Sequence, residues 1–233
     1  MPDNGSAGDR LDGIDMFVRS PERKTLCVVI DREGRVCVRA PLRMPLETIR
    51  RFIDSRREWI GHKKSAALER LAQIPVKNFT EGEQFLFKGQ LYPLRFRPDA
   101  AAPIVFDRAF IIHENYRRRA RGMLIGWYEN KAHQMIEERV KVYADAFSIE
   151  YTDLKVRDTR SQWGSCTADG RLCFSWRLVM CPTRIIDYVV AHELAHRRHM
   201  NHSPEFWALV SCMRPDYKEQ QQWLKDNSPL LRF

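Results

Sequence analysis

The chain has 233 residues, of which 44% are hydrophobic, and its formal net charge at pH 7 is +9. It is long enough for one ordinary domain with an appendage or for two small domains. No apolar run approaches the roughly 20 residues of a membrane span, and the first residues lack the apolar core of a secretory signal, so we expect no membrane partner.

The six cysteines are scattered along the chain, and no two of them form a CxxC pair. This spacing argues against a cysteine-rich zinc ribbon and against a disulfide framework. Free thiols are typical of a reducing compartment, so we expect a cytoplasmic protein. The polar and acidic start of the chain, residues 1–15, is predicted to be a disordered tail.

Residues 16–115 are predicted to form a β-rich region with one helix. Two apolar runs within 25–40 flank a glycine-containing turn, which is the pattern of a β-hairpin. A helix is predicted from about Leu46 towards Leu71, because apolar residues recur there at three-and-four spacing. Further pairs of short strands are expected over 79–96 and 104–113.

Residues 116–233 are predicted to form a compact α+β domain with a small antiparallel sheet. A long helical pattern covers 123–147, and strands over 155–160 and 171–178 flank a Gly-containing segment. Three helices are expected to close the chain: one around residue 190, one over 203–213 and one over about 216–226.

A basic cluster precedes the long helix, with four arginines and no acid between residues 116 and 122: Arg117, Arg118, Arg119 and Arg121. The positive end of a helix dipole disfavours cations, so either the arginines precede the helix or an acidic group lies nearby. Weak, non-specific binding of nucleic acid is one hypothesis for this cluster, and a solvated basic face is the commoner alternative.

The most informative segment is Ala191-His192-Glu193-Leu194-Ala195-His196, an HExxH pattern. Residues four apart lie one turn apart on a helix, so His192 and His196 can bind one metal ion from the same face. Glu193 points beside the metal, where a carboxylate can accept a proton from water. A solvated helix with incidental histidines is the bland alternative, but the apolar run Ile185–Val190 predicts a buried helix, with Thr183 as its N-cap.

Four residues could supply the third metal ligand: His199, His202, Glu205 and Glu219. His199 lies about 10 Å along the helix from His192, too far for an unstrained site. His202 stands at an expected corner, before a Ser N-cap and a Pro at the first helical position. We therefore predict His202 as the ligand, and an exposed position at the helix end for His199.

Three segments of the chain resemble the YgjP-like metallopeptidases, bacterial zincins related to the SprT-like and minigluzincin groups. They are Thr159–Cys166 (TRSQWGSC), Ile186–His196 (IDYVVAHELAH) and Asn201–Trp207 (NHSPEFW). The resemblance implies a zincin-like metallopeptidase domain over 116–233, zinc bound by His192, His196 and His202, and Glu193 as the general base.

The leading hypothesis is a zinc metallopeptidase that cleaves a peptide or protein substrate through a zinc-activated water. The alternatives are a DNA-associated SprT-like protease and a non-enzymatic zinc-stabilised binding module. The strand predicted over 171–178 is the candidate edge for an extended substrate, and Phe174 and Trp176 in it could equally be core residues. Candidates for oxyanion stabilisation are Arg160, Tyr188 and Tyr217, while Cys166 is expected to be an inert, partly buried thiol.

Overall fold

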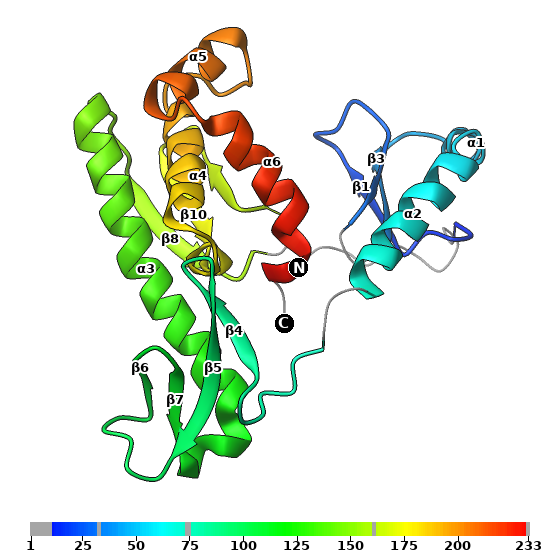
Figure 1. Cartoon of the computed structure of the whole chain (residues 1–233). Coiled ribbons are helices and arrows are strands. Elements are labelled where there is room, and N and C mark those ends of the chain that lie inside the picture. Colours follow the sequence, from blue (N-terminus) through cyan, green and yellow to red (C-terminus); the bar gives the residue numbers. More distant parts are fainter. Residues whose placement is uncertain (1–10, 32–33, 73–75, 160–161, 232–233) are drawn as a thin grey trace. The chain divides into compact units, whose positions relative to one another are not determined.

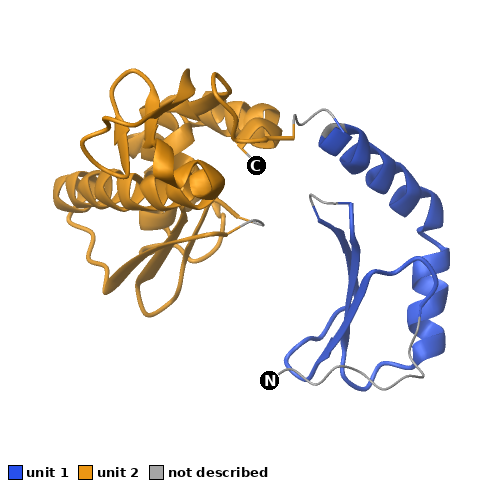
Figure 2. Ribbon diagram, turned by 90° about the horizontal axis from the view of Figure 1, so that it is seen from below, with its two compact units in different colours: residues 1–75 blue, residues 76–233 orange. Residues whose placement is uncertain are grey.

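The computed structural model describes residues 11–31, 34–72, 76–159 and 162–231. The chain divides into two compact units, Met1–Pro75 and Val76–Phe233 (Figure 2). Each unit has its own hydrophobic core. The structure therefore divides earlier than the expected boundary at residue 115. The strands between residues 84 and 113 belong to the second unit because their inward phenylalanines, such as Phe85 and Phe110, share its core.

The described residues of the first unit form three strands and two helices: β1 Met16–Ser20, β2 Cys27–Ile30, β3 Val36–Pro41, α1 Leu46–Asp54 and α2 Arg57–Ala72 (Figure 1). The predicted hairpin is confirmed, because β2 and β3 pair antiparallel. The sequence analysis missed β1, which pairs parallel with β3. The inward side chains of β3 are fully buried in this unit's core.

The single helix expected over 46–71 is in fact two helices, with a break at residues 55 and 56. The Ser55 hydroxyl donates to the Phe52 carbonyl oxygen, and the Arg56 amide donates to Ile53, only three residues earlier. These short local bonds replace the regular ladder and separate α1 from α2.

The predicted disordered tail falls largely outside the described residues, which begin at Leu11. Within the described part, residues 11–15 do not form such a tail. Leu11 is buried in the core of the first unit, and the Asp15 carboxylate accepts a hydrogen bond of 2.7 Å from the Val36 amide. The contacts of Leu11 and Asp15 tie this segment to β3.

The second unit begins with four strands and continues through a long helix. These elements are β4 Gln84–Phe87, β5 Gln90–Arg97, β6 Ile104–Phe106, β7 Phe110–His113, the 3-10 helix η1 Glu114–Arg119 and α3 Ala120–Phe147. The strands form one sheet in the order β4-β5-β7-β6. Lys88 and Gly89 turn the first hairpin with positive φ angles of 50° and 79°, as a two-residue hairpin of the favoured handedness requires.

The rest of the second unit surrounds a smaller sheet. Its elements are β8 Asp153–Arg157, β9 Gly164–Cys166, β10 Arg171–Ser175, the 3-10 helix η2 Trp176–Met180, α4 Thr183–Ala195, α5 Pro204–Met213, α6 Tyr217–Asn227 and the 3-10 helix η3 Ser228–Leu231. Nearly every predicted element is present, within a few residues of its expected bounds.

The smaller sheet differs from expectation in two ways. It is mixed, because β10 pairs parallel with β8 and antiparallel with β9. In addition, β10 is the central strand, so the segment 171–178 cannot serve as an exposed edge, and its last residues enter η2. Among the described residues, β9 pairs only with β10, which leaves β9 as an edge strand.

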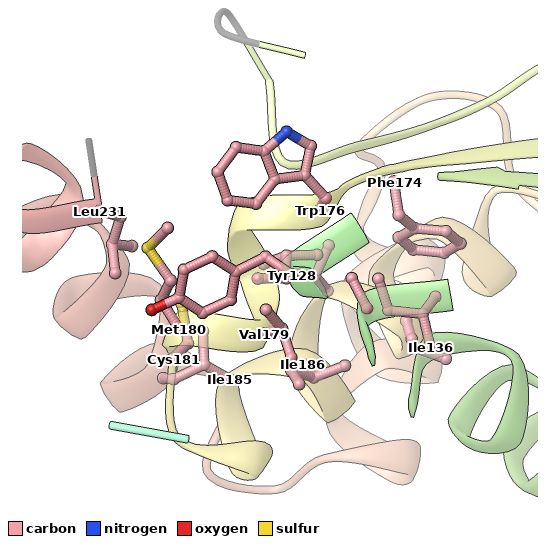
Figure 3. Close-up of a cluster of buried hydrophobic side chains, with 14 of the residues drawn as sticks. Tyr128, Ile136, Phe174, Trp176, Val179, Met180, Cys181, Ile185, Ile186 and Leu231 are labelled. Carbon is pink, nitrogen blue, oxygen red and sulfur yellow. The ribbon is translucent and has the colours of Figure 1, made fainter. Parts of the chain in front are cut away.

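The core of the second unit lies between α3, η2 and α4 (Figure 3). Along α3, buried residues recur every four positions, at Leu124, Tyr128, Ala132, Ile136 and Val140. The Tyr128 ring stacks on the Trp176 ring, with the two centroids 5.7 Å apart, and its hydroxyl donates to the Leu86 carbonyl oxygen. Phe174 and Trp176 are almost fully buried, so their role is packing. No described helix is both long and apolar enough to cross a membrane.

Candidate metal centre

Helix α4 carries the HExxH segment in its last turns. Ten of its thirteen residues are buried, because the helix packs against α3, and α5 and α6 also contact it. The helix begins differently from expectation: Pro182 occupies the N-cap position, and Thr183 is the first helical residue without a capping side-chain bond. Pro182 has no amide hydrogen to satisfy, and its carbonyl oxygen accepts from Ile185, which starts the helical ladder.

The three predicted histidines come together in the structure. One ring nitrogen each from His192, His196 and His202 lies within 4.8 Å of the other two. The Nε2 atoms of His192 and His202 are 3.1 Å apart. Tetrahedral ligands at about 2.1 Å from one zinc ion lie about 3.4 Å apart, so the three imidazoles need only small rotations to share an ion.

His202 reaches this cluster because the chain turns sharply after α4. Ser203 is the N-cap of α5 and accepts a bond from the Phe206 amide, and Pro204 is the first helical residue, as predicted. His202, the residue before this cap, lies outside both helices. Its side chain can therefore return towards His192 while α5 leads away.

The His199 side chain is not part of the cluster, but the His199 backbone carbonyl orients the ring of His196. The His196 Nδ1 atom lies 3.1 Å from the His199 carbonyl oxygen. A carbonyl can only accept, so Nδ1 carries the hydrogen and the lone pair is on Nε2, the nitrogen left free for a metal. The His199 side chain is half-buried, whereas an exposed one was expected.

Two aromatic residues of α5 hold the imidazole rings in place, and the sequence analysis assigned them no such role. Phe206 is fully buried, and its ring centroid lies 4.5 Å from that of His196 and 4.9 Å from that of His192. Trp207 stacks on His202 at 5.7 Å and on Tyr217 at 5.2 Å. The sequence did contain a signal for them: they lie four and five residues after His202. Side chains in the first turns of the next helix can point back towards that histidine.

The surroundings keep the imidazoles of His192 and His196 neutral. Burial, together with the neighbouring His196 and His202, lowers the pKa of His192 to about 3. Burial also lowers the pKa of His196. A neutral imidazole has a lone pair to offer a metal, so the cluster is suited to coordination at neutral pH.

Glu193 lies beside the cluster and is 5% exposed. Its carboxylate forms no hydrogen bond or ion pair with a described residue, and burial raises its pKa to about 8. A pKa near neutrality suits a group that both takes up and releases a proton. A dication held by the three histidines would favour the charged form of this carboxylate.

The edge strand β9 approaches Glu193 very closely. A Cβ atom added to Gly164 would lie 2.6 Å from Glu193 Oε1 and 2.7 Å from its Cγ. Only a glycine leaves room for the carboxylate at this point of the strand. The sequence analysis quoted Gly164 within the TRSQWGSC segment but gave it no role.

Two arginines directly after the motif fix the end of α4, and the sequence analysis missed both. Arg197 donates to the carbonyl oxygens of Glu150 and Ala168, at 3.0 Å each, and so holds the turn between β9 and β10. Arg198 donates at 2.7 Å to the Phe147 carbonyl oxygen at the end of α3. Their position after His196 gave no sign of these partners, which lie about thirty to fifty residues away in sequence.

A buried ionic network joins α4 to α3 and to the corner between α5 and α6. Asp187, 6% exposed, accepts from Arg139 of α3 and from Arg214, whose Nη1 lies 3.4 Å away. Arg214 also pairs with Asp216, at 2.7 Å. The network fixes how α5, which follows His202, meets the metal-site helix.

The other proposed ligands do not join the three histidines. Within the described ranges, the only group of histidine, cysteine and acidic residues able to share an ion is the triad itself. Glu205 is exposed, and a hydrogen bond from Ser203 lowers its pKa, while Glu219 is exposed on α6. Cys166 is half-buried, and burial raises the pKa of its thiol, in keeping with the inert role predicted for it.

Of the candidates for oxyanion stabilisation, Arg160 lies outside the described residues. Tyr188 is buried one turn before His192, with the ring centroids 6.0 Å apart. Burial, against a hydrogen bond with Gln221, raises the pKa of the Tyr188 hydroxyl to about 12. Tyr217 stacks on Trp207 and so lies on the same side of the site.

Three of the four arginines of the basic cluster precede the long helix, one of the two arrangements expected, while Arg121 lies in its first turn. Arg117, Arg118 and Arg119 lie in η1, and α3 begins at Ala120. Arg117 already has partners: it donates two bonds to the Glu114 carboxylate and lies 4.0 Å from the Phe96 ring centroid. This leaves fewer free cations in the cluster than the sequence suggests.

The residues present fit a metal ion. His192 Nδ1 is buried without a hydrogen-bond partner among the described residues, and its Nε2 faces Nε2 of His202. The protein alone satisfies this ring poorly, because one of its two nitrogens stays unpaired whichever of them carries the hydrogen. A cation that accepts the Nε2 lone pairs suits this arrangement, and three imidazoles with an open fourth position are typical of catalytic zinc.

Comparison with known proteins agrees with this geometry. The family model described as the YgjP-like metallopeptidase domain matches residues 24–227, most of the chain. No curated protein and no solved structure matches the chain significantly.

Proposed function

Because the chain belongs to the YgjP-like metallopeptidase family, we propose that it is a zinc-dependent peptidase whose ion is held by His192, His196 and His202. The proposal is carried by one observation: three imidazoles converge within 4.8 Å beside the buried carboxylate of Glu193. A family of metallopeptidases implies a divalent metal, and three nitrogen ligands favour zinc among the common ones.

When bound, zinc supplies Lewis acidity, which polarises the scissile carbonyl and lowers the pKa of water. Glu193 accepts the proton of the attacking water and then gives it to the leaving amine. The raised pKa of Glu193 supports both halves of this transfer, since the group can hold the proton between the two steps. His199 and Phe206 orient the imidazole of His196 through its Nδ1 atom and its ring face.

The substrate would bind as an extended strand along β9. An extended peptide adds to a free sheet edge through backbone hydrogen bonds, and β9 has such an edge among the described residues. The absence of a side chain at Gly164 brings the Glu193 carboxylate against this strand. A peptide paired with β9 would therefore present its backbone to the general base.

The non-enzymatic alternative explains Glu193 poorly. A purely structural site needs no base, and burying a carboxylate without a partner costs free energy.

The cysteines are free, which suits the reducing cytoplasm that we propose as the compartment.

Replacing Glu193 with glutamine tests the function. We expect Glu193→Gln to retain its metal and fold but to lose about 10² to 10⁴ in the rate of peptide hydrolysis. A peptide library supplies the substrate, and elemental analysis supplies the metal content. Glu205→Gln, an exposed carboxylate close to the site, is the matched control. Undiminished cleavage by Glu193→Gln would remove Glu193 from the mechanism.

A further inference from the structure

A cavity of about 520 Å³ lies at the beginning of α4, at the other end of the helix from the histidines. Three parts of the second unit line it: the β4–β5 turn, the junction between η2 and α4, and the end of α6 with η3. This volume is within the range of small-molecule sites. None of the functional residues described above lines it.

Apolar and polar groups share the walls of the cavity almost equally. Leu91 and Leu230 contribute apolar side chains that are 61% and 54% exposed, and the half-buried Trp223 also lines the cavity. Large apolar side chains left open to water around a hollow favour an apolar ligand group, because its binding removes their surface from solvent.

Among the described residues, the charges that line the cavity are all positive. Lys88 and Arg184 are the ionisable residues of this lining, and no carboxylate of the described residues belongs to it. Neither cation forms an ion pair with a carboxylate of the described residues. The amides of Gln90 and Asn227 add further hydrogen-bond donors. The cavity therefore favours a ligand with an anionic group beside an apolar one.

The backbone of the turn that carries Lys88 is bonded to η2, just before α4. The Lys88 and Gly89 amides donate to the carbonyl oxygens of Val179 and Met180, at 2.9 Å and 2.8 Å. A Cβ atom at Gly89 would lie 2.6 Å from the Pro182 ring, so the turn fits tightly against the helix start. Binding at such a site needs little reordering of the backbone.

The cavity and the metal centre lie at the two ends of the same helix, α4. Arg184, Tyr188 and His192 follow one another at four-residue spacing, so they share one face of α4. Eight residues of helix correspond to about 12 Å. An extended peptide advances about 3.3 Å per residue, so about four residues would span the distance.

We propose that this cavity binds the C-terminal end of the peptide substrate, about four residues from the bond that is cleaved. The apolar last side chain would lie against Trp223 and Leu91, and the free α-carboxylate would pair with Lys88 and Arg184. This inference rests on the proposed peptidase function, and it makes the enzyme selective for chain ends.

Binding can be measured apart from catalysis in Glu193→Gln protein loaded with zinc. The probe is an acetylated pentapeptide that ends in leucine, used with a free carboxylate and with a C-terminal amide. By calorimetry we expect the acid to bind about threefold to tenfold more tightly than the amide at low salt. Adding Lys88→Gln and Arg184→Gln should reduce binding of the acid to the level of the amide and leave the amide unchanged.

Arg95→Gln is the matched control, because Arg95 is an exposed arginine of β5 that does not line the cavity. Thermal melting of each variant checks that the fold is retained. Equal binding of acid and amide, or acid binding unchanged in the double variant, would overturn the assignment of the cavity.

Mass analysis of products from wild-type protein tests the spacing. We expect cuts about four residues from a free C-terminus, and amidation should raise KM rather than lower kcat. Cuts placed without regard to the chain end would overturn the proposed role in substrate selection. Carboxylate-selective binding without cleavage of any peptide would contradict the peptidase function and leave the cavity as a carboxylate site.

Discussion

A Cβ atom at position 164 would lie 2.6 Å from Oε1 of Glu193, so the edge strand and the general base meet at a glycine. Real Cβ atoms do not approach other atoms so closely, and one of the two groups would have to move. The strand is fixed by its pairing with β10, which leaves the carboxylate as the group displaced.

We therefore expect Gly164→Ala to lower peptide hydrolysis about 10²-fold, because a small misplacement of a catalytic group is costly. Metal content should be unchanged, since the three atoms nearest to the added Cβ all belong to Glu193 and not to a metal ligand. Gly126→Ala in α3 is the control, because nothing lies within 4 Å of its added Cβ. Wild-type rates in Gly164→Ala would show that Glu193 tolerates the displacement.

The metal ligands can be distinguished by elemental analysis of purified variants. His202→Ala should lose most of the zinc, whereas His199→Ala should keep it, because only the backbone carbonyl of His199 faces His196. The opposite pattern, with zinc kept by His202→Ala and lost by His199→Ala, would refute the ligand assignment.

The metal-free protein should show a pH dependence of stability that originates at Glu193. Burial raises its pKa to about 8, so between its ordinary pKa of 4.5 and pH 8 the folded state binds the proton that the unfolded state has released. Stability from this group is therefore lost as the pH rises through that window. Glu193→Gln should become progressively more stable than wild type from pH 4.5 to 8, as measured by thermal melting in chelator.

His192 produces the opposite trend in acid. Its pKa is about 3 in the folded state against an ordinary 6.5, so below pH 6.5 the unfolded state takes up a proton that the folded state refuses. The metal-free protein should lose stability as the pH falls from 6.5 towards 3, and His192→Ala should flatten this slope. An unchanged slope in that variant would place the acid sensitivity elsewhere.

Asp187→Asn should destabilise the protein by about 3 kcal/mol, because it leaves Arg139 and Arg214 without their shared buried carboxylate. Urea denaturation measures the change. Asp153→Asn is the comparison, since it breaks an exposed pair with Lys155 that should contribute little to stability. A similar effect of the two substitutions would mean that burial of the Asp187 network adds no stability.

The basic cluster before α3 permits a test of nucleic-acid binding. If its arginines contact phosphates, DNA affinity should fall steeply with salt, and replacing Arg117, Arg118 and Arg119 with glutamine should flatten that dependence. Because Arg117 already pairs with Glu114, we expect the cluster to be a solvated face and the binding to be weak. Tight, salt-sensitive binding that the triple substitution abolishes would favour the DNA-associated alternative.

The sequence by itself determined the local elements and the identity of the candidate site. Hydrophobic periodicity located the hairpins, the long helix and α4, because each pattern reflects which face of a local element is buried. The four-residue spacing of His192 and His196 placed two imidazoles on one helical face. The Ser203-Pro204 start of the next helix placed His202 at a corner. Both the histidine spacing and the helix start are short-range properties of the backbone.

Tertiary structure alone decided what surrounds those residues. The order of strands made β10 central and β9 the edge, a choice that depends on β8 pairing from another part of the chain. Likewise, Gly164 contacts Glu193 only after the chain has folded. The same holds for the hydrogen bonds from Arg197 and Arg198 to carbonyl groups that are distant in sequence. Local propensity carries no information about such long-range contacts, so the supporting shell of the site and the cavity at the start of α4 could not be read from the sequence.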